Sequence, residues 1–276
     1  MRSPALRQTG ISLVEIMIAL VLSLFLSAGV IEIYLASKQS YRTQEGYSRL
    51  QENGRYAIDT LTHFIRLAGY KPLNGNVLPT DSVAFAVDGV NFAGFVGAGQ
   101  VIAGSNGAGS ASDTIALQYQ DDDLMGDCGS PAADTAGPDL KRRSIVFAID
   151  ANQNLTCATV EQNLTTLVAT TTAAQPLLEG VENMQIQYGI DTDAPADGYA
   201  NQYKAADALT AAEWLTVVSV RVALLLNTVG NISGEADTDT FSLLGASISA
   251  PAATDPNRFM RRHPFTITVS LRNRTP

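Results

Sequence analysis

One apolar stretch near the N-terminus constrains this 276-residue chain more than any other part of it. Positions 11–36 are mostly apolar, and the segment from Ile16 to Ile31 carries no charge. Because about 20 apolar helical residues cross a bilayer core, the stretch is long enough to span a membrane. The acid that it carries near its start is Glu15, and an ionisable group inside a membrane span is costly. We therefore expect Glu15 to have a functional role.

The residues before this stretch distinguish it from an ordinary secretory signal. A secretory signal is cleaved after its apolar region, at a pattern of small residues. Here a short leader, residues 1–10, contains Arg2 and Arg7 and ends in Gly10, which precedes the apolar run. The two arginines favour a cytoplasmic N-terminus by the positive-inside rule. The remainder of the chain is then expected on the other side of the membrane.

The order of these residues resembles the signature of type IV prepilins. A basic leader is followed by Gly10, by the hydrophobic residue Ile11 where the family usually has Phe, and by Glu15 at the fifth position. The resemblance implies that prepilin peptidase cleaves between Gly10 and Ile11 and that Ile11 is N-methylated. It also implies that Glu15 pairs with the terminal amine of a neighbouring subunit. Ser12 and Glu15 also match a capping box, so a capping role within the subunit is compatible with the same pattern.

The helical pattern continues beyond the membrane stretch into residues 37–70. Apolar residues recur there mostly at three- and four-residue steps, charged residues occupy much of the remaining surface, and Gly69 and Pro72 provide an end. A helix from Ile11 to about Ala68 would be roughly 87 Å long. The apolar face that we expect to pack on a sheet consists of Leu50, Ala57, Leu61, Phe64, Ile65 and Ala68.

Residues 71–276 are expected to form a β-rich globular domain. The stretch 72–112 is rich in Gly, Ala, Asn and Val, and predicts an irregular connection with one or two short strands. Alternating or continuous apolar patterns then predict strands at Thr114–Tyr119, Ser144–Ile149, Asn154–Ala158, Met184–Ile190, Val217–Leu226 and Phe265–Leu271. Because no regular helices separate these strands, we expect an α+β fold in which the long N-terminal helix packs on a mainly antiparallel sheet.

Segments throughout the chain resemble the PilW family of minor pilins. They are Ser37–Arg42, Leu50–Arg55, Ile65–Tyr70, Glu179–Gln185 and Phe265–Asn273. The resemblance implies a type IV pilin-like fold and a structural subunit of the type IV pilus. Such a subunit would help to prime the fibre and form its tip complex, in support of twitching motility, adhesion or DNA uptake.

The same resemblance implies partners and a location. The partners would be other minor pilins, the major pilin and the tip adhesin, with prepilin peptidase as the processing enzyme. The chain would cross the inner membrane once, with residues 71–276 in the periplasm before assembly and in the fibre at the cell surface afterwards.

Two other functions are compatible with parts of the pattern. A minor pseudopilin of the type II secretion system would share the architecture and serve protein export. A secreted β-rich binding domain would instead lose an ordinary signal peptide near Ser27–Gly29. The twitching and secretion phenotypes of a deletion distinguish a pseudopilin from a minor pilin. The intact mass of the mature chain distinguishes a secreted domain from a pilin.

The sequence offers no constellation typical of catalysis or of a cofactor. His63 and His263 belong to no nucleophile elbow and no zinc-binding pattern, so we expect neither an enzyme nor a cofactor site. The net charge of −9 argues against direct binding of nucleic acid. A cluster at Asp121–Asp127 and a calcium-like loop at Asp191–Gly198 are expected to be solvated acids, with calcium binding as the alternative. The second has Pro195 at a ligand position and lacks the closing Glu.

Two cysteines and a basic C-terminal end complete the candidate residues. Cys128 and Cys157 suit an oxidising compartment, and we expect them to form a disulfide, with two buried free thiols as the alternative. The basic end either docks on an acidic neighbour or pairs with acids of its own domain. It consists of Arg258, Arg261, Arg262, Arg272 and Arg274.

Overall fold

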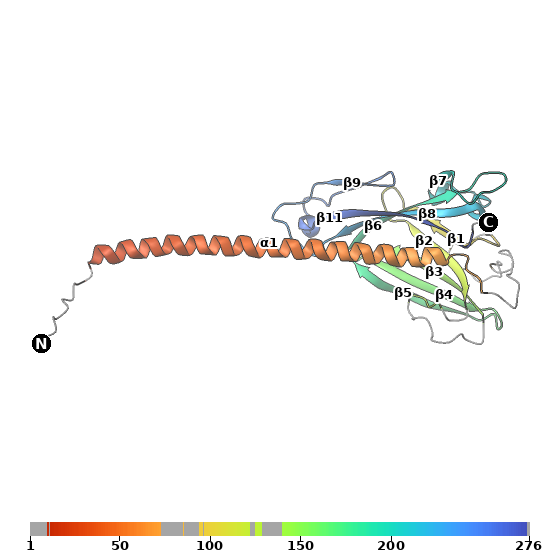
Figure 1. Cartoon of the computed structure of the whole chain (residues 1–276), viewed down its shortest axis with the longest axis horizontal. Coiled ribbons are helices and arrows are strands. Elements are labelled where there is room, and N and C mark those ends of the chain that lie inside the picture. Colours follow the sequence, from red (N-terminus) through yellow and green to blue (C-terminus); the bar gives the residue numbers. More distant parts are fainter. Residues whose placement is uncertain are drawn as a thin grey trace, which may run out of the picture. The chain divides into compact units, whose positions relative to one another are not determined.

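The computed structural model describes residues 10, 12–72, 85, 94–95, 97–121, 125–128 and 140–274. Within these residues one long helix is followed by strands and three short 3-10 helices (Figure 1). The chain divides into two compact units, Met1–Glu45 and Gly46–Pro276. Helix α1, Leu13–Leu67, contributes its first part to the first unit and its last part to the second.

The first unit consists, in its described part, of the start of α1. Every described residue from Ser12 to Arg42 is exposed, although most of them are apolar up to Ala36. A side chain at the position of Gly29 would meet no neighbouring atom. This part of the helix therefore presents an apolar surface around its whole circumference.

The second unit contains a five-stranded antiparallel sheet in the order β1-β2-β3-β4-β5. Its strands follow one another along the chain as a meander. The tight turn between the third and fourth strands is closed by Asp150, whose carboxylate accepts hydrogen bonds from the backbone N–H of Asn152 and Asn154. The strands are β1 Ile102–Ser105, β2 Thr114–Asp121, β3 Lys141–Ile149, β4 Asn154–Asn163 and β5 Ala169–Glu179.

A second antiparallel sheet has the order β11-β8-β6-β7. Gly180, with a φ of 81°, leads the chain from β5 of the first sheet into β6 of the second. The short hairpin β9-β10 covers part of the outer face, where Leu243 packs on Ala223 and Leu225. The bounds are β6 Val181–Ile190, β7 Gln202–Lys204, β8 Val217–Asn227, β9 Thr240–Leu243, β10 Ala246–Ser249 and β11 Arg262–Ser270. The 3-10 helices are η1 Ala206–Ala208, η2 Glu213–Thr216 and η3 Pro256–Phe259.

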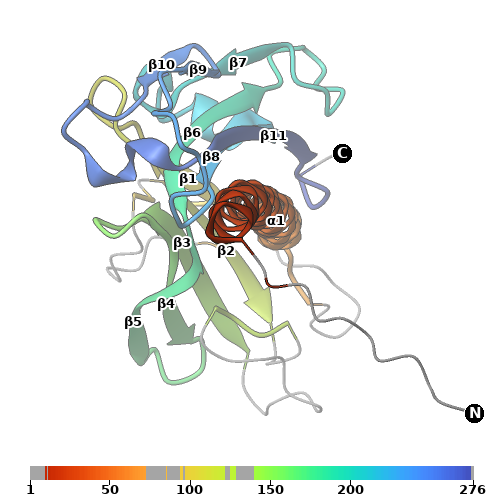
Figure 2. The same ribbon diagram turned by 90° about the vertical axis from the view of Figure 1, so that its left-hand side faces the viewer.

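The last part of α1 packs against both sheets and completes the core (Figure 2). The ring centroid of Phe64 lies 5.6 Å from that of Phe147 on β3. On the other side, Gly54 lies against the ring of Phe265 on β11. All six residues of the expected apolar face are buried, so the amphipathic pattern of residues 50–68 identified the packed face correctly.

A buried carboxylate joins the two sheets at the start of β2. Asp113 accepts hydrogen bonds from the backbone N–H of Gly107 at 2.8 Å and of Ile186 on β6 at 2.7 Å. Its own backbone N–H donates to the carbonyl oxygen of Met184. Burial raises the pKa of Asp113, and the two backbone hydrogen bonds oppose that rise. The loop after β1 is thereby held against the second sheet.

The α+β fold and its long N-terminal helix are confirmed, and the helix bounds agree with the sequence within two residues. All six predicted strands are present. The stretch 72–112 lies partly outside the described residues, and its described part contains one short strand, β1. The sequence did not predict β5, β7, β9 or β10.

Candidate functional site

The start of α1 places Glu15 in the first turn of the helix. The backbone N–H groups of Glu15 and Ile16 both donate to the carbonyl oxygen of Ser12, at 3.1 and 3.2 Å. The amide of Glu15 is thus satisfied by the backbone of Ser12 rather than by its hydroxyl. The carboxylate of Glu15 lies on an exposed part of the helix.

The helix around Glu15 has the length and composition of a membrane span. It contains an 18-residue window that is apolar enough to cross a bilayer, and none of that window is buried within the chain. The hydroxyl of Ser23 donates to the carbonyl oxygen of Leu20, so this polar group is satisfied within the helix. The large exposed side chains are Leu13, Val14, Ile16, Met17, Ile18, Leu20, Val21, Leu22, Leu24, Phe25, Leu26, Val30, Ile31, Ile33, Tyr34 and Leu35.

The predicted cleavage site is described only in part. Gly10 is exposed, and a side chain at its position would meet no other atom within 4 Å. Ile11 and the leader residues before Gly10 lie outside the described residues. Cleavage after Gly10, methylation of Ile11 and pairing of Glu15 therefore remain predictions.

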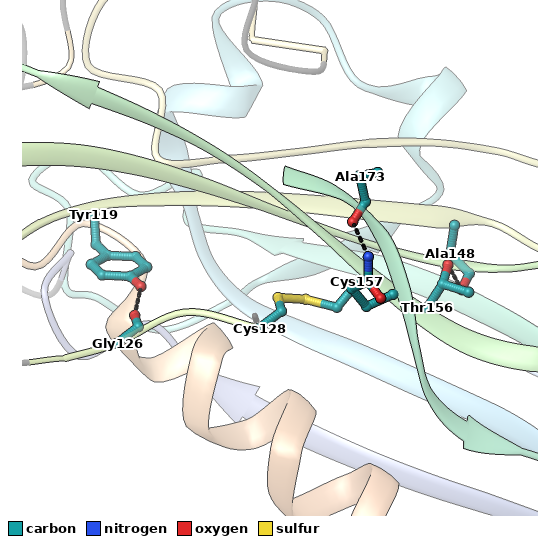
Figure 3. The surroundings of a disulfide bond; sticks show 8 residues. Tyr119, Gly126, Cys128, Ala148, Thr156, Cys157 and Ala173 are labelled. Atoms are coloured by element: carbon teal, nitrogen blue, oxygen red, sulfur yellow. Dashed lines mark hydrogen bonds between the residues drawn. A yellow bond between two sulfur atoms is a disulfide. The ribbon is translucent and has the colours of Figure 1, made fainter. Parts of the chain in front are cut away.

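The expected disulfide between Cys128 and Cys157 is present, and their Cα atoms are 5.8 Å apart (Figure 3). Cys157 belongs to β4, and Cys128 belongs to the short described segment that follows β2. The same segment is held at Gly126, whose carbonyl oxygen accepts a hydrogen bond from the buried hydroxyl of Tyr119. Burial raises the pKa of Tyr119 above its usual value. The disulfide and this hydrogen bond together fix the segment on the first sheet.

The expectation of solvated acids is wrong for Asp121. This residue is buried at the end of β2, and its Oδ2 lies 3.2 Å from Nη1 of Arg143 on β3. Nη2 of the same arginine lies 2.9 Å from Glu161 on β4. The strand register places the arginine beside both carboxylates, so Asp121 serves the sheet as a buried ion-pair partner. Residues 122–124 of this cluster lie outside the described residues.

The calcium-like loop is also less solvated than expected, because Asp191 is buried. Carboxylate oxygens of Asp191, Asp193 and Asp197 lie within 4.8 Å of one another. However, Asp191 accepts hydrogen bonds from the backbone N–H of Asp193 and Gly198, which hold its pKa below its usual value. The side-chain amide of Asn201 donates to Asp193. The acids therefore close this loop through hydrogen bonds of their own.

The two interpretations of the basic C-terminal end are resolved for Arg262. Its guanidinium binds Glu182 on β6 through two hydrogen bonds, of 2.7 and 2.9 Å, and Asp237 through a third, of 3.2 Å. Arg261 donates to the hydroxyl of Ser233, and Arg274 donates to the carbonyl oxygens of Gly99 and Leu215. The acids paired with Arg262 belong to its own domain, and this network was not apparent from the sequence.

Comparison with known proteins bears on the C-terminal part of the chain. The model of the PilW family, type IV pilus-assembly protein W, matches residues 146–273. The resemblance to the PilW family is confirmed. These residues include all strands from β4 to β11, and thus the whole of the second sheet.

The solved structures include a type IV-like pilin from Thermus thermophilus that is similar to this chain. The two are 14% identical with a TM-score of 0.46, and the similarity covers 83% of this chain and 98% of that one. No curated protein gave a significant sequence match. The PilW match and the long N-terminal helix on antiparallel sheets support a pilus-related pilin subunit. Its apolar helix fits a membrane-anchored subunit that interacts with other pilus components.

Proposed function

We propose that this PilW-type chain is a minor pilin that helps to prime the type IV pilus and to form its tip complex. The observation that carries the proposal is the carboxylate of Glu15 on an exposed, otherwise apolar helix surface. In lipid or in a dry fibre core, an unpaired carboxylate is strongly unfavourable, whereas pairing with a cation offsets its desolvation. A second molecule is therefore needed to complete the site.

The proposed partner of Glu15 is a terminal amine that leader removal creates. Cleavage after Gly10 would make Ile11 the first residue, and an α-amine is normally charged near neutral pH. A subunit whose Glu15 meets the amine of the subunit ahead would be held in axial register with it. The partners in this proposal are other minor pilins, the major pilin and the tip adhesin, after processing by prepilin peptidase.

The location follows from the same proposal. The chain would cross the inner membrane once, with residues 71–276 in the periplasm before assembly and at the cell surface in the fibre. The disulfide between Cys128 and Cys157 supports an oxidising compartment for this domain. Deletion of the gene should abolish twitching motility and leave type II secretion intact, and the opposite pattern would favour a pseudopilin.

The intact mass of the chain from its native cells tests the processing step. We expect a mature chain that begins at Ile11 and carries one additional methyl group. A chain that retains its leader, or one cleaved near Ser27–Gly29, would refute the proposal. The second outcome would favour a secreted binding domain.

Replacing Glu15 by alanine should leave membrane insertion unchanged and lower incorporation into fibres. We expect a loss of about tenfold or more, which corresponds to 1.4 kcal/mol of lost interaction. The measurement compares the amount of chain in sheared fibres with the amount in membranes. Glu32→Ala is the matched control, because it removes another exposed acid from the same helix and leaves the Glu15 carboxylate in place. Wild-type incorporation of the Glu15→Ala chain would contradict the proposed pairing.

A further inference from the structure

The edge strand β5 differs from the other sheet edges in the described part of the chain. The edges β1 and β7 have four and three residues. The edge β11 has nine residues, but its first part contains Arg262 and Pro264, residue types that blunt sheet edges. β5 has eleven residues, is paired among the described strands with β4 alone, and is exposed on both faces from Ala169 to Pro176. Among the described residues, no strand pairs with the other side of its backbone, which could accept another strand.

The two halves of β5 differ in how well they are protected against such pairing. Its second half contains two register irregularities and Pro176, and bulges and prolines blunt the edges of natural sheets. Its first half, Ala169–Thr172, pairs with β4 in regular register. This half carries neither the charges nor the proline that usually prevent edge-to-edge pairing. A strand that adds to β5 would therefore pair with its first half.

The turn before β5 presents two apolar side chains beside this half. Leu167 and Val168 are 65% and 62% exposed. The turn is well fixed, since the side-chain oxygen of Asn163 accepts hydrogen bonds from the backbone N–H of Thr165 and Thr166. The backbone N–H of Leu167 also donates to the carbonyl oxygen of Asn163. Leu167 adopts a φ of 59°, a left-handed conformation that costs a non-glycine residue about 1 kcal/mol or more. A rigid turn thus holds two apolar groups where a partner can cover them.

The direction of β5 determines which strand can pair with it in an assembly. β5 runs opposite to the last part of α1, whereas β11 runs along it (Figure 1). Contacts agree that β11 runs along the helix, because the earlier residue Phe265 meets Gly54 and the later residue Asn273 lies near the helix end. The side chain of Asn273 donates to the carbonyl oxygens of Arg66 and Ala68. In subunits whose helices lie side by side and point the same way, β5 of one subunit is antiparallel to the last strand of the next. Antiparallel pairing is the more stable arrangement per residue.

We propose that residues 167–172, the docking strand, bind the C-terminal edge strand of a neighbouring pilin-type subunit by β-strand addition. This inference rests on the proposed function, because it assumes parallel helices in a fibre. Backbone hydrogen bonds would supply the affinity, and apolar contacts with Leu167 and Val168 would add specificity. The docking strand carries no charge, although the net charge of the chain is −9. A partner strand that is also uncharged would therefore bind without the cost of removing water from charged groups. The strand Phe265–Leu271 of this chain has that character itself.

The test places a photo-reactive amino acid at Thr171 of the full chain in cells that assemble fibres. Irradiation is expected to attach a peptide from the C-terminal edge strand of a protein with a prepilin-type N-terminus, as identified by mass spectrometry. The same amino acid at Thr254, an exposed loop residue, is the control and should give no such product. Ala169→Lys should lower the yield at Thr171 about tenfold, since a charged edge disfavours pairing, whereas Thr254→Lys should leave it unchanged.

The proposal is overturned if Thr171 gives no product, or if the attached peptide comes from outside an edge strand or from a protein that is not pilin-like. Failure here can be told apart from failure of the proposed function. A chain that still enters fibres and still depends on Glu15, but gives no product at Thr171, is a pilin without strand docking. A chain that never enters fibres would refute the proposed function itself.

Discussion

Replacing Arg262 by methionine is expected to lower the free energy of unfolding by about 3–5 kcal/mol, the usual cost of removing one partner from a buried ion pair. The side chain of Arg262 is 1% exposed, and those of Glu182 and Asp237 are 11% and 2% exposed. The guanidinium also donates to the carbonyl oxygens of Met260 and Asn257. Methionine fills much of the same volume and leaves both carboxylates without a positive partner.

Urea unfolding measures this effect through the single tryptophan, Trp214, which is buried against Tyr188. The shift of the midpoint at unchanged slope gives the change in free energy. Arg258→Met is the matched control, because Arg258 donates to the carbonyl oxygen of Ala253 and stacks on Phe259 rather than on an acid. We expect less than about 1 kcal/mol for the control, as for exposed polar contacts.

A compensating set of substitutions separates charge from packing at this site. If the unpaired carboxylates cause the loss, adding Glu182→Gln and Asp237→Asn to Arg262→Met should recover part of it, because the three side chains form one network. No recovery would indicate that the packing of the arginine stem dominates. An Arg262→Met chain within about 1 kcal/mol of the wild type would show that the buried pair contributes little.

The network around Arg262 also shows what the sequence could not predict. The apolar period of residues 50–68 identified the packed face of α1, because a helix face repeats every three to four residues. The partners of Arg262 lie 80 and 25 residues away along the chain. Their proximity depends on the register of β6, β8 and β11 and on the path after β8, which no local pattern specifies. The sequence therefore left the role of the basic end open.

The strand β5 was missed for a related reason. Strand prediction relies on alternation between a buried and an exposed face. From Ala169 to Pro176 both faces of β5 are exposed, so its sequence, which is mostly Thr and Ala, shows no alternation. Asp121 and Asp191 illustrate the reverse error, since acids in polar stretches were expected in solvent but are buried with partners. Glu15 was singled out by its motif, and its proposed pairing involves a residue of another subunit.

Leucine at Gly54 is expected to destabilise the second unit by about 1–3 kcal/mol or more, the usual range for overpacking a core. A Cβ at this position would lie 2.5 Å from both Cε atoms of the Phe265 ring. Phe265 cannot move aside easily, because β11 pairs with β8 along its whole length and places it opposite Leu224. The gain in helix propensity on replacing glycine, about 1 kcal/mol at most, does not offset this overlap.

Gly46 provides a matched comparison, because it is a second buried glycine of the same helix. A Cβ there would meet the side chain of Ile232 less closely, at 2.9 Å from Cγ2 and 3.0 Å from Cδ1. Because this overlap is smaller, Gly46→Ala should change the unfolding midpoint less than Gly54→Ala.

The double substitution Gly54→Leu with Phe265→Ala tests the cause directly. If overlap with the ring is responsible, the double variant should be more stable than the sum of the two single effects predicts, because the leucine fills the space that the ring vacates. Additive losses would show that glycine is needed at position 54 for another reason. The same pair also reports on β11, since a strand that could shift away from α1 would absorb the leucine with little loss.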